Sequence, residues 1–410
     1  MTKQQKVSLI GTILLFGFCV ASYLYYIIGG DYFQAHYPLN TFLFDPSDKF
    51  NDFFNVLRMA QHRDAYLHDS AYSTNIGLTA NYFPFLYSIM HILGKIGNNE
   101  AFAIYLVSLI SMMSYLSYRF LWKDEKLDTQ TKLAALGIAF FSFPFLFCID
   151  RGNVEAFVFI FTGFFFLSFM KGKYKTAAVF IALASAMKLY PCVLAWLFIK
   201  KKQYKACVIS GVLTIAISVA SMLTMKGGFM ENFNGLIREL GHFTTHYTLY
   251  EQTKTDGFLF DIGFNGVSLF GVLRHIGHFI PLEIGVSSEY MAFNIFAVMI
   301  LMPIIYYVLK YENELWKHSF ILSSFTILFM GTSFDYKMLS LLLSLFLFIN
   351  TPSANFDRKY CILFAILFIP KALPVTINGY GFSISDTFNA LLILYINYSI
   401  IKERLFTKTA

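Results

Sequence analysis

The chain has 410 residues, of which 57% are hydrophobic and only 14% are charged. A soluble protein carries about a quarter charged residues, so this composition excludes an ordinary soluble enzyme. The net charge of +7 does not indicate nucleic-acid binding, because the lysines stand in short runs between apolar segments, as in loops that face anionic lipid. The many separated apolar stretches predict an all-α, polytopic helical membrane protein rather than a β-barrel.

The hydropathy and the lysine clusters predict about 10–12 transmembrane helices, with both termini in the cytoplasm. Ten full spans are expected near residues 7–28, 100–121, 133–149, 155–170, 206–225, 287–309, 318–332, 337–350, 360–373 and 387–402. We expect a single domain over residues 1–410. Its large outer segments are 29–99, which should contain amphipathic juxtamembrane helices, and 226–286.

Two further apolar segments do not fit this topology as simple spans. Residues 176–199 lie between two lysine clusters, and a single crossing would place one cluster outside. Because Pro191 breaks a helix near the residue before it, we expect a re-entrant hairpin with Lys188 and Tyr190 at its tip. A single span remains the alternative. Residues 81–96 are expected to lie along the outer surface as an amphipathic helix.

Three carboxylates crowd the first outer segment directly after the first span: Asp45, Asp48 and Asp52. Asp48 and Asp52 are four residues apart, so a helix that begins near Asp48 would present both on one face. One interpretation is a general base held at the membrane interface. The other is an N-capping cluster, in which Asp48 accepts hydrogen bonds from free backbone amides. The sequence leaves open whether Asp48 or Asp52 is the base.

A second polar group is the short outer segment Asp150-Arg151-Gly152-Asn153-Val154-Glu155. Arg151 and Glu155 are in helical register, and Gly152 lets the backbone approach a ligand. Arg151, Asn153 and Glu155 are therefore candidate substrate-binding residues. The alternative is a plain turn between two spans, with Arg151 and Glu155 paired.

Lys188 stands in the middle of an apolar segment. A lysine at such a position costs about 2.5–3.5 kcal/mol on insertion scales and is usually functional. At the tip of a hairpin, Lys188 and the neighbouring Tyr190 would meet a lipid-linked substrate, the lysine as a point charge for a phosphate. The alternative is that Lys188 snorkels to the interface.

The second large outer segment carries further candidates. Asn265, Ser268 and Arg274 are expected to contact substrate. His242 and His246 are four residues apart and would share one face of a helix, but no third ligand stands in register with them. We therefore predict no metal site and expect no cofactor.

In chain order these segments resemble the GT-C superfamily of membrane glycosyltransferases. The stretch Asn51-Asp52-Phe53-Phe54, followed by Tyr82-Phe83-Pro84-Phe85-Leu86, is similar to the Asp-Phe and Tyr-Pro-Pro-Leu pattern of glycosyltransferase family 87. Residues 150–155 and Met187-Lys188-Leu189-Tyr190-Pro191 resemble the Arg-Gly…Glu and Lys-x-Tyr-Pro pattern of that family and of the GPI mannosyltransferases. Residues 265–271 resemble the family's Asn-x-Ser-Leu-x-Gly segment, with one extra residue. The resemblance covers about residues 45–275, and residues 287–410 match only in hydropathy.

The resemblance implies inverting transfer of a sugar from a polyprenyl-phosphate donor to a glycan or glycolipid acceptor. It implies that the reaction takes place on the non-cytoplasmic face of a multi-pass protein in contact with membrane lipid. The only Asn-x-Ser/Thr sequon, at Asn397, lies inside an apolar span, which favours the bacterial plasma membrane over the endoplasmic reticulum. Asp52 aligns best with the family's catalytic base, and cations would stabilise the departing phosphate. The alternatives are a flippase or transporter of a lipid-linked glycan, which would line a path through many spans with charge, and a polymerase, which would carry arginine-rich outer loops. The chain has only eight arginines.

Overall fold

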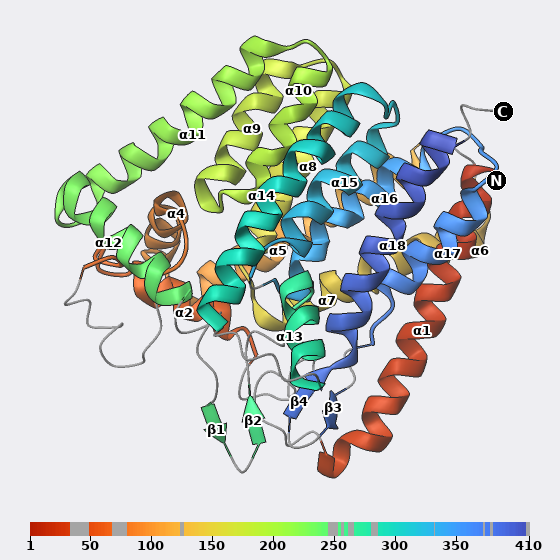
Figure 1. Ribbon diagram of the computed structural model, residues 1–410, viewed down its shortest axis with the longest axis horizontal. Coiled ribbons are helices and arrows are strands. Elements are labelled where there is room, and N and C mark those ends of the chain that lie inside the picture. The colour runs from red at the N-terminus through yellow and green to blue at the C-terminus, as the bar shows by residue number, and fades with distance from the viewer. Residues whose placement is uncertain are drawn as a thin grey trace. The chain divides into compact units, whose positions relative to one another are not determined.

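The computed structural model describes residues 1–32, 49–67, 80–123, 127–244, 253–255, 258–260, 266–279, 286–331, 333–371, 374–377 and 380–406. Helices make up most of this part of the chain, and its four strands are short (Figure 1). Within the same residues, four helices are long and apolar enough to span a membrane, namely Lys3–Leu24, Asn98–Trp122, Tyr204–Thr224 and Glu289–Lys310. The predicted class of polytopic helical membrane protein is confirmed, whereas the number of spans stays a prediction.

The chain forms two compact units. Unit 1 contains Met1–Lys49, Ser111–Asp150 and Glu251–Ala410, and unit 2 contains Phe50–Ile110 and Arg151–Tyr250. The single domain expected from the sequence stays a prediction.

Unit 1 is a helical bundle with a small sheet. Its helices are α1 (Lys3–Tyr32), the π-helix η1 (Tyr118–Trp122), α6 (Thr129–Phe140), α7 (Phe143–Arg151, whose last residue belongs to unit 2), α13 (Leu269–Phe279), α14 (Val286–Lys310), α15 (Leu315–Leu328), the 3-10 helix η5 (Asp335–Met338), α16 (Leu339–Ile349), α17 (Asp357–Phe368) and α18 (Ile384–Phe406). The strands are β1 (Thr253–Thr255), β2 (Phe258–Phe260), β3 (Pro374–Ile377) and β4 (Tyr380–Ser383). They follow the order β1-β2-β4-β3, in which only the β2–β4 pair is parallel.

In unit 1, α1 packs against α6 and α17, and α15 packs against α16 and α18. The contact between α1 and α6 is so close that a Cβ at Gly11 would overlap the backbone of Ala134. Small residues allow such an approach between membrane helices. The span predicted over 133–149 is instead two helices, α6 and α7, bent by 45° at their junction. Pro144 explains the break, since it has no amide hydrogen for the helical ladder and its ring clashes with the preceding turn.

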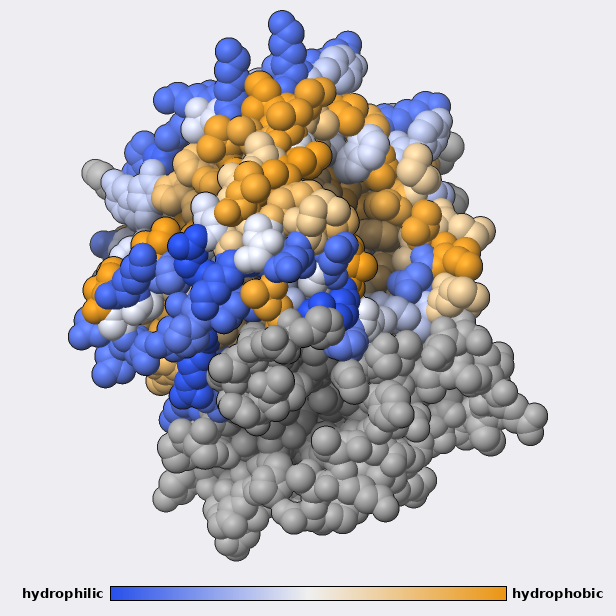
Figure 2. All heavy atoms as spheres, turned by 90° about the vertical axis from the view of Figure 1, so that its left-hand side faces the viewer, coloured by the Kyte–Doolittle hydropathy of each residue, from blue (hydrophilic) through white to orange (hydrophobic). Residues whose placement is uncertain are grey.

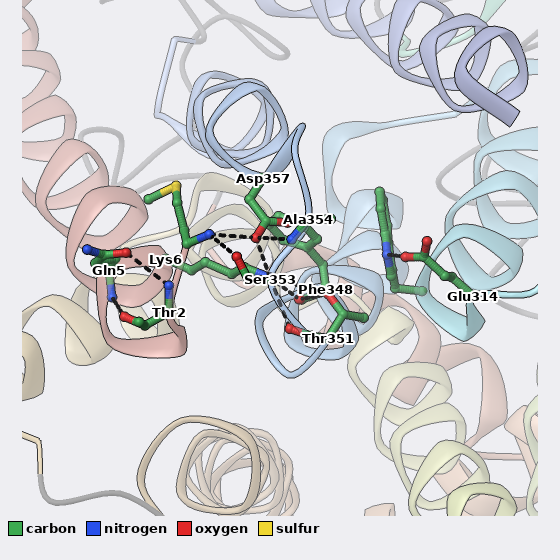
Figure 3. Close-up of polar contacts among 11 residues, drawn as sticks. Thr2, Gln5, Lys6, Glu314, Phe348, Thr351, Ser353, Ala354 and Asp357 are labelled. Carbon is green, nitrogen blue, oxygen red and sulfur yellow. Dashed lines mark hydrogen bonds and ion pairs between the residues drawn. The ribbon is translucent and has the colours of Figure 1, made fainter. Parts of the chain in front are cut away.

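A buried lysine ties α1 to the start of α17. The Nζ of Lys6 lies 3.3 Å from Oδ2 of Asp357 and donates hydrogen bonds to the carbonyl oxygens of Phe348 and Thr351 (Figure 3). The Lys6 side chain is fully buried. Since a buried charge is costly unless it is paired and hydrogen-bonded, this network holds the start of α1 against the start of α17.

Unit 2 consists of helices only in its described part. These are α2 (Asn51–Ala60), α4 (Pro84–Gly94), α5 (Asn98–Ser117, which continues into unit 1), α8 (Glu155–Met170), α9 (Tyr174–Met187), the 3-10 helix η2 (Tyr190–Ala195), α10 (Trp196–Lys200), α11 (Tyr204–Thr224) and α12 (Gly228–Phe243). Helix α9 packs between α8 and α11, and α4 packs on α2 and α11.

Two local predictions for unit 2 are confirmed. The helix over 174–187 ends at Met187, and η2 begins at Tyr190 with Pro191 in its first turn, so the segment breaks where the sequence predicts. A helix also forms within 81–96, as α4. The re-entry of the first segment into the membrane and the surface position of the second stay predictions.

The surface of unit 2 along α11 carries exposed apolar side chains. Figure 2 shows apolar side chains gathered on the side that bears α11, with hydrophilic side chains above and below them. Along α11 the exposed apolar side chains are Val208, Val212, Ile215 and Leu223. An exposed apolar face of this kind on a soluble protein would be unfavourable, whereas on a membrane span it faces lipid.

Candidate functional site

Asp52 lies in the first turn of α2. The helix begins at Asn51, after Phe50 in a left-handed conformation with φ 63°, so the predicted helix start near Asp48 is wrong. The left-handed residue interrupts the helical path, and α2 can begin only after it. The carboxylate of Asp52 therefore stands at the positive end of the helix dipole. Asp45 and Asp48 lie outside the described residues.

Both carboxylate oxygens of Asp52 accept short hydrogen bonds. Nη2 of Arg151 donates to Oδ1 at 2.7 Å, and Nδ2 of Asn153 donates to Oδ2 at 2.6 Å. Asn153 is itself fixed, because its carbonyl accepts from the Tyr105 hydroxyl and its Oδ1 accepts from the Glu155 amide. The side chain of Asp52 is 21% exposed and that of Arg151 only 7%. The carboxylate is thus held rigidly but remains open on one side.

Gly152 makes this contact possible. It has φ 62°, and a Cβ there would lie 3.0 Å from Cα of Phe50 and from Cβ of Phe53. Such a conformation favours glycine, and the absent side chain leaves room for the start of α2. The sequence predicts that Gly152 lets the backbone approach a ligand, whereas in the structure the group that lies against Gly152 is the start of α2.

A second ion pair joins Glu155 to Lys188. The Nζ of Lys188 lies 2.7 Å from Oε2 of Glu155, and the two side chains are 13% and 2% exposed. The ion pair therefore holds the amine of Lys188 inside unit 2, and the alternative of snorkelling to a membrane interface stays open. The alternative prediction that Arg151 pairs with Glu155 is wrong, because α7 ends at Arg151 and each of the two residues forms its ion pair with a distant segment.

Tyr82 lies beside both ion pairs, and the sequence analysis did not select it as a site residue. Lys188 Nζ is 5.0 Å from the centroid of the Tyr82 ring, a cation–π distance. Burial, followed by the negative charges of Asp52 and Glu155, raises the pKa of the Tyr82 hydroxyl well above its ordinary value. The phenol therefore stays protonated. In the sequence, Tyr82 could have been selected as a site residue because it belongs to the Tyr-Phe-Pro stretch that is similar to the family pattern.

Backbone contacts fix Tyr82 in this position. The hydroxyl of Tyr66 donates to the Tyr82 carbonyl, and the amide of Phe83 donates to the Met187 carbonyl at 3.2 Å. The guanidinium of Arg238, on α12, donates in turn to the Tyr66 carbonyl. Helix α12 thus supports Tyr66 and Tyr82 through backbone carbonyls.

The two carboxylates of the ion pairs lie at helix N-termini, and the two cations lie at helix C-termini. Asp52 and Glu155 lie in the first turns of α2 and α8, Arg151 lies in the last turn of α7, and Lys188 directly follows α9. Helix N-termini stabilise carboxylates, and C-termini stabilise cations. The arrangement brings a partly open carboxylate and two cations together, as the transfer of a group from a phosphate ester requires.

The remaining candidates lie on other elements of the chain. Tyr190 begins η2 in unit 2. Ser268 belongs to unit 1, where it is fully buried and its Oγ accepts a hydrogen bond from the Gly271 amide at the start of α13. Arg274 lies on α13, but its side chain and the whole of Asn265 are outside the described residues.

Metal ligands do not gather in the described residues, where no group of three or more His, Cys, Asp and Glu side chains could hold a metal ion. His242 lies in the last turn of α12, and His246 is outside the described part.

No curated protein sequence matches the chain. The family profile of glycosyltransferase family 87 matches residues 81–331, more than half of the chain. The match contains Arg151, Asn153, Glu155 and Lys188 and extends beyond the expected limit near 275, but it begins after Asp52. The chain therefore belongs to glycosyltransferase family 87, a GT-C-type family of membrane glycosyltransferases.

Proposed function

We propose that the protein transfers a sugar from a polyprenyl-phosphate donor to a hydroxyl of a glycan or glycolipid acceptor, with inversion at the anomeric carbon. The reaction takes place on the outer face of the bacterial plasma membrane. The observation that carries this proposal is the carboxylate of Asp52, held between Arg151 and Asn153 and still 21% exposed.

Asp52 is the proposed general base. Its carboxylate takes the proton of the acceptor hydroxyl while the acceptor oxygen attacks the anomeric carbon. The bond from that carbon to the phosphate oxygen breaks at the same time, and the polyprenyl phosphate leaves with the electron pair. A single displacement from the face opposite the leaving group inverts the configuration.

Asp52 is preferred to Asp48 because its contacts are to residues within the family match. Arg151 and Lys188 are the cations available to the departing phosphate, whose charge rises as the bond breaks. Asp48 remains the alternative candidate for the base. The other predicted substrate-binding residues, Asp45, Tyr190, Asn265, Ser268 and Arg274, are proposed to contact the donor or the acceptor.

Transfer by a carboxylate variant tests the mechanism. Purified protein is incubated with a panel of radiolabelled polyprenyl-phosphate sugars and membrane glycolipid acceptors. General-base catalysis contributes typically 10²–10⁴-fold, so Asp52→Asn should slow transfer on that order. Asp64→Asn is a matched control in the same unit, because the Asp64 side chain is 18% exposed and pairs with Lys226. Wild-type transfer by folded Asp52→Asn would refute the role of this carboxylate.

The outer-face location is tested by cysteine labelling in intact cells. Asn153 is fully buried, so a cysteine there would not report topology, whereas Asn234 on α12 is exposed. In a cysteine-free variant, Asn234→Cys should react with an impermeant thiol reagent, and Lys173→Cys and Lys201→Cys should not. Labelling of only one of the two lysine positions would show that the segment between them crosses the membrane.

A further inference from the structure

The charges of the site already neutralise one another. Asp52 pairs with Arg151, and Glu155 pairs with Lys188, each at 2.7 Å. A polyprenyl-phosphate donor carries negative charge, and burying it requires a compensating cation. The incoming phosphate therefore has to take a cation away from one of the two carboxylates.

The two pairs differ in what this exchange would cost. Glu155 is 2% exposed, so loss of Lys188 would leave a carboxylate buried without its counter-charge, which is strongly unfavourable. Asp52 is 21% exposed and keeps the hydrogen bond from Asn153 when Arg151 moves away. Arg151 also carries a planar guanidinium that matches phosphate geometry. Displacing Arg151 from Asp52 therefore costs less free energy than displacing Lys188 from Glu155.

We propose that the donor phosphate displaces Asp52 from Arg151, so that Asp52 becomes available as a base only after the donor has bound. This inference rests on the proposed function, because it assigns a regulation and a binding order to the same site. Lys188 keeps its ion pair with Glu155 throughout and acts on the departing phosphate through its charge, without leaving Glu155. Without donor, Arg151 occupies the carboxylate, and an acceptor hydroxyl that enters first meets a base engaged on both oxygens.

The proposal makes an unusual prediction: removal of the catalytic charge should strengthen phosphate binding. In Asp52→Asn the phosphate no longer competes with a carboxylate for Arg151. Because a charge-assisted hydrogen bond is among the stronger ones and each 1.4 kcal/mol is tenfold in affinity, a short-chain polyprenyl phosphate should bind roughly tenfold more tightly to Asp52→Asn than to the wild-type protein. The corresponding polyprenol, which has no phosphate, should bind both proteins equally.

Two further variants make the result specific. Asp52→Asn/Arg151→Gln should lose the gain, because the cation that the phosphate would use is absent. Glu155→Gln should not bind the phosphate more tightly than the wild type. All variants are measured in detergent after their thermal unfolding has been compared with that of the wild type, and the Asp52/Arg151 comparison stands even where Glu155→Gln does not fold.

The outcomes separate this inference from the proposed function. Equal affinity of Asp52→Asn and wild type for the polyprenyl phosphate overturns the exchange. Tighter binding by Glu155→Gln and not by Asp52→Asn also overturns it, since Lys188 would then be the phosphate ligand. If the wild-type protein transfers sugar but Asp52→Asn shows no gain in phosphate affinity, the exchange is refuted and the proposed function is retained. If the wild-type protein neither binds polyprenyl phosphate nor transfers sugar, both the exchange and the proposed function are refuted.

Discussion

Gly152→Ala should damage transfer although glycine carries no chemical group. The added Cβ would lie 3.0 Å from Cα of Phe50 and 3.1 Å from its carbonyl oxygen, so the start of α2 has to move by a few tenths of an ångström or more. The left-handed backbone, with φ 62°, costs a further 1–2 kcal/mol, roughly, for a residue with a Cβ. The hydrogen bond from Arg151 to Asp52 is 2.7 Å long, and such a shift of α2 would lengthen or misalign it. Because a misplacement of about 1 Å costs on the order of 10²-fold in rate, we expect transfer to fall by roughly 10- to 100-fold.

The chain offers a matched control for this experiment. Gly172 has φ 69°, and no atom lies within 4 Å of the position that a Cβ would occupy. Gly172→Ala therefore carries the same backbone penalty without displacing a neighbour. Thermal unfolding should show the backbone penalty in both variants and a larger loss in Gly152→Ala, which also displaces Phe50, while steady-state transfer should fall only in Gly152→Ala. If folded Gly152→Ala transfers sugar at the wild-type rate, the close approach at Gly152 does not position Asp52.

The buried ion pairs give two more predictions. Lys188→Met should lower the free energy of unfolding by about 3–5 kcal/mol, because it leaves Glu155 buried without its counter-charge, and Lys188→Met/Glu155→Gln should recover much of the loss in the same denaturation assay. An unchanged stability of Lys188→Met would show that Glu155 needs no partner. Asp357→Asn should cause a loss of similar size through the fully buried Lys6, with sugar transfer retained by the folded fraction. Burial opposes the shift, but the Ala354 amide and Lys6 lower the pKa of Asp357, so the stability from this pair is present above the ordinary pKa of an aspartate and is lost as the pH falls through the lowered value.

Much of the site could be predicted because its residues are polar in an apolar chain. Asp52, Arg151, Glu155 and Lys188 stand out against the hydrophobic background, and the topology places the first three on one face. The partners could not be predicted in the same way. Arg151 is 99 residues from Asp52, and helical register relates only residues within a turn or two. Register therefore favoured an Arg151–Glu155 pair, whereas in the folded chain Arg151 pairs with Asp52 and Glu155 pairs with Lys188.

The fold shows the same division between local and distant information. Hydropathy located the helices, and Pro191 located the break after Met187. The bend at Pro144 was missed because the apolar run continues through it, although the same rule applies. The left-handed conformation of Phe50 has no signal in the sequence, and neither does the packing of its ring against Phe102, with ring centroids 4.5 Å apart.

The separation between Asp52 and its partners also has a consequence for biosynthesis. At about 5–20 residues per second, the ribosome completes Asp52 roughly 5–20 s before it reaches Arg151, 99 residues later. Helix α2 has 10 residues, shorter than the 12–15 or so that an isolated helix needs to be more than marginally stable in water. During this interval the segment that contains α2 lacks the contacts that later fix its carboxylate. The geometry of the proposed site therefore arises late, when the loop before α8 is in place, and errors in the insertion of that loop would leave a fully synthesised protein without it.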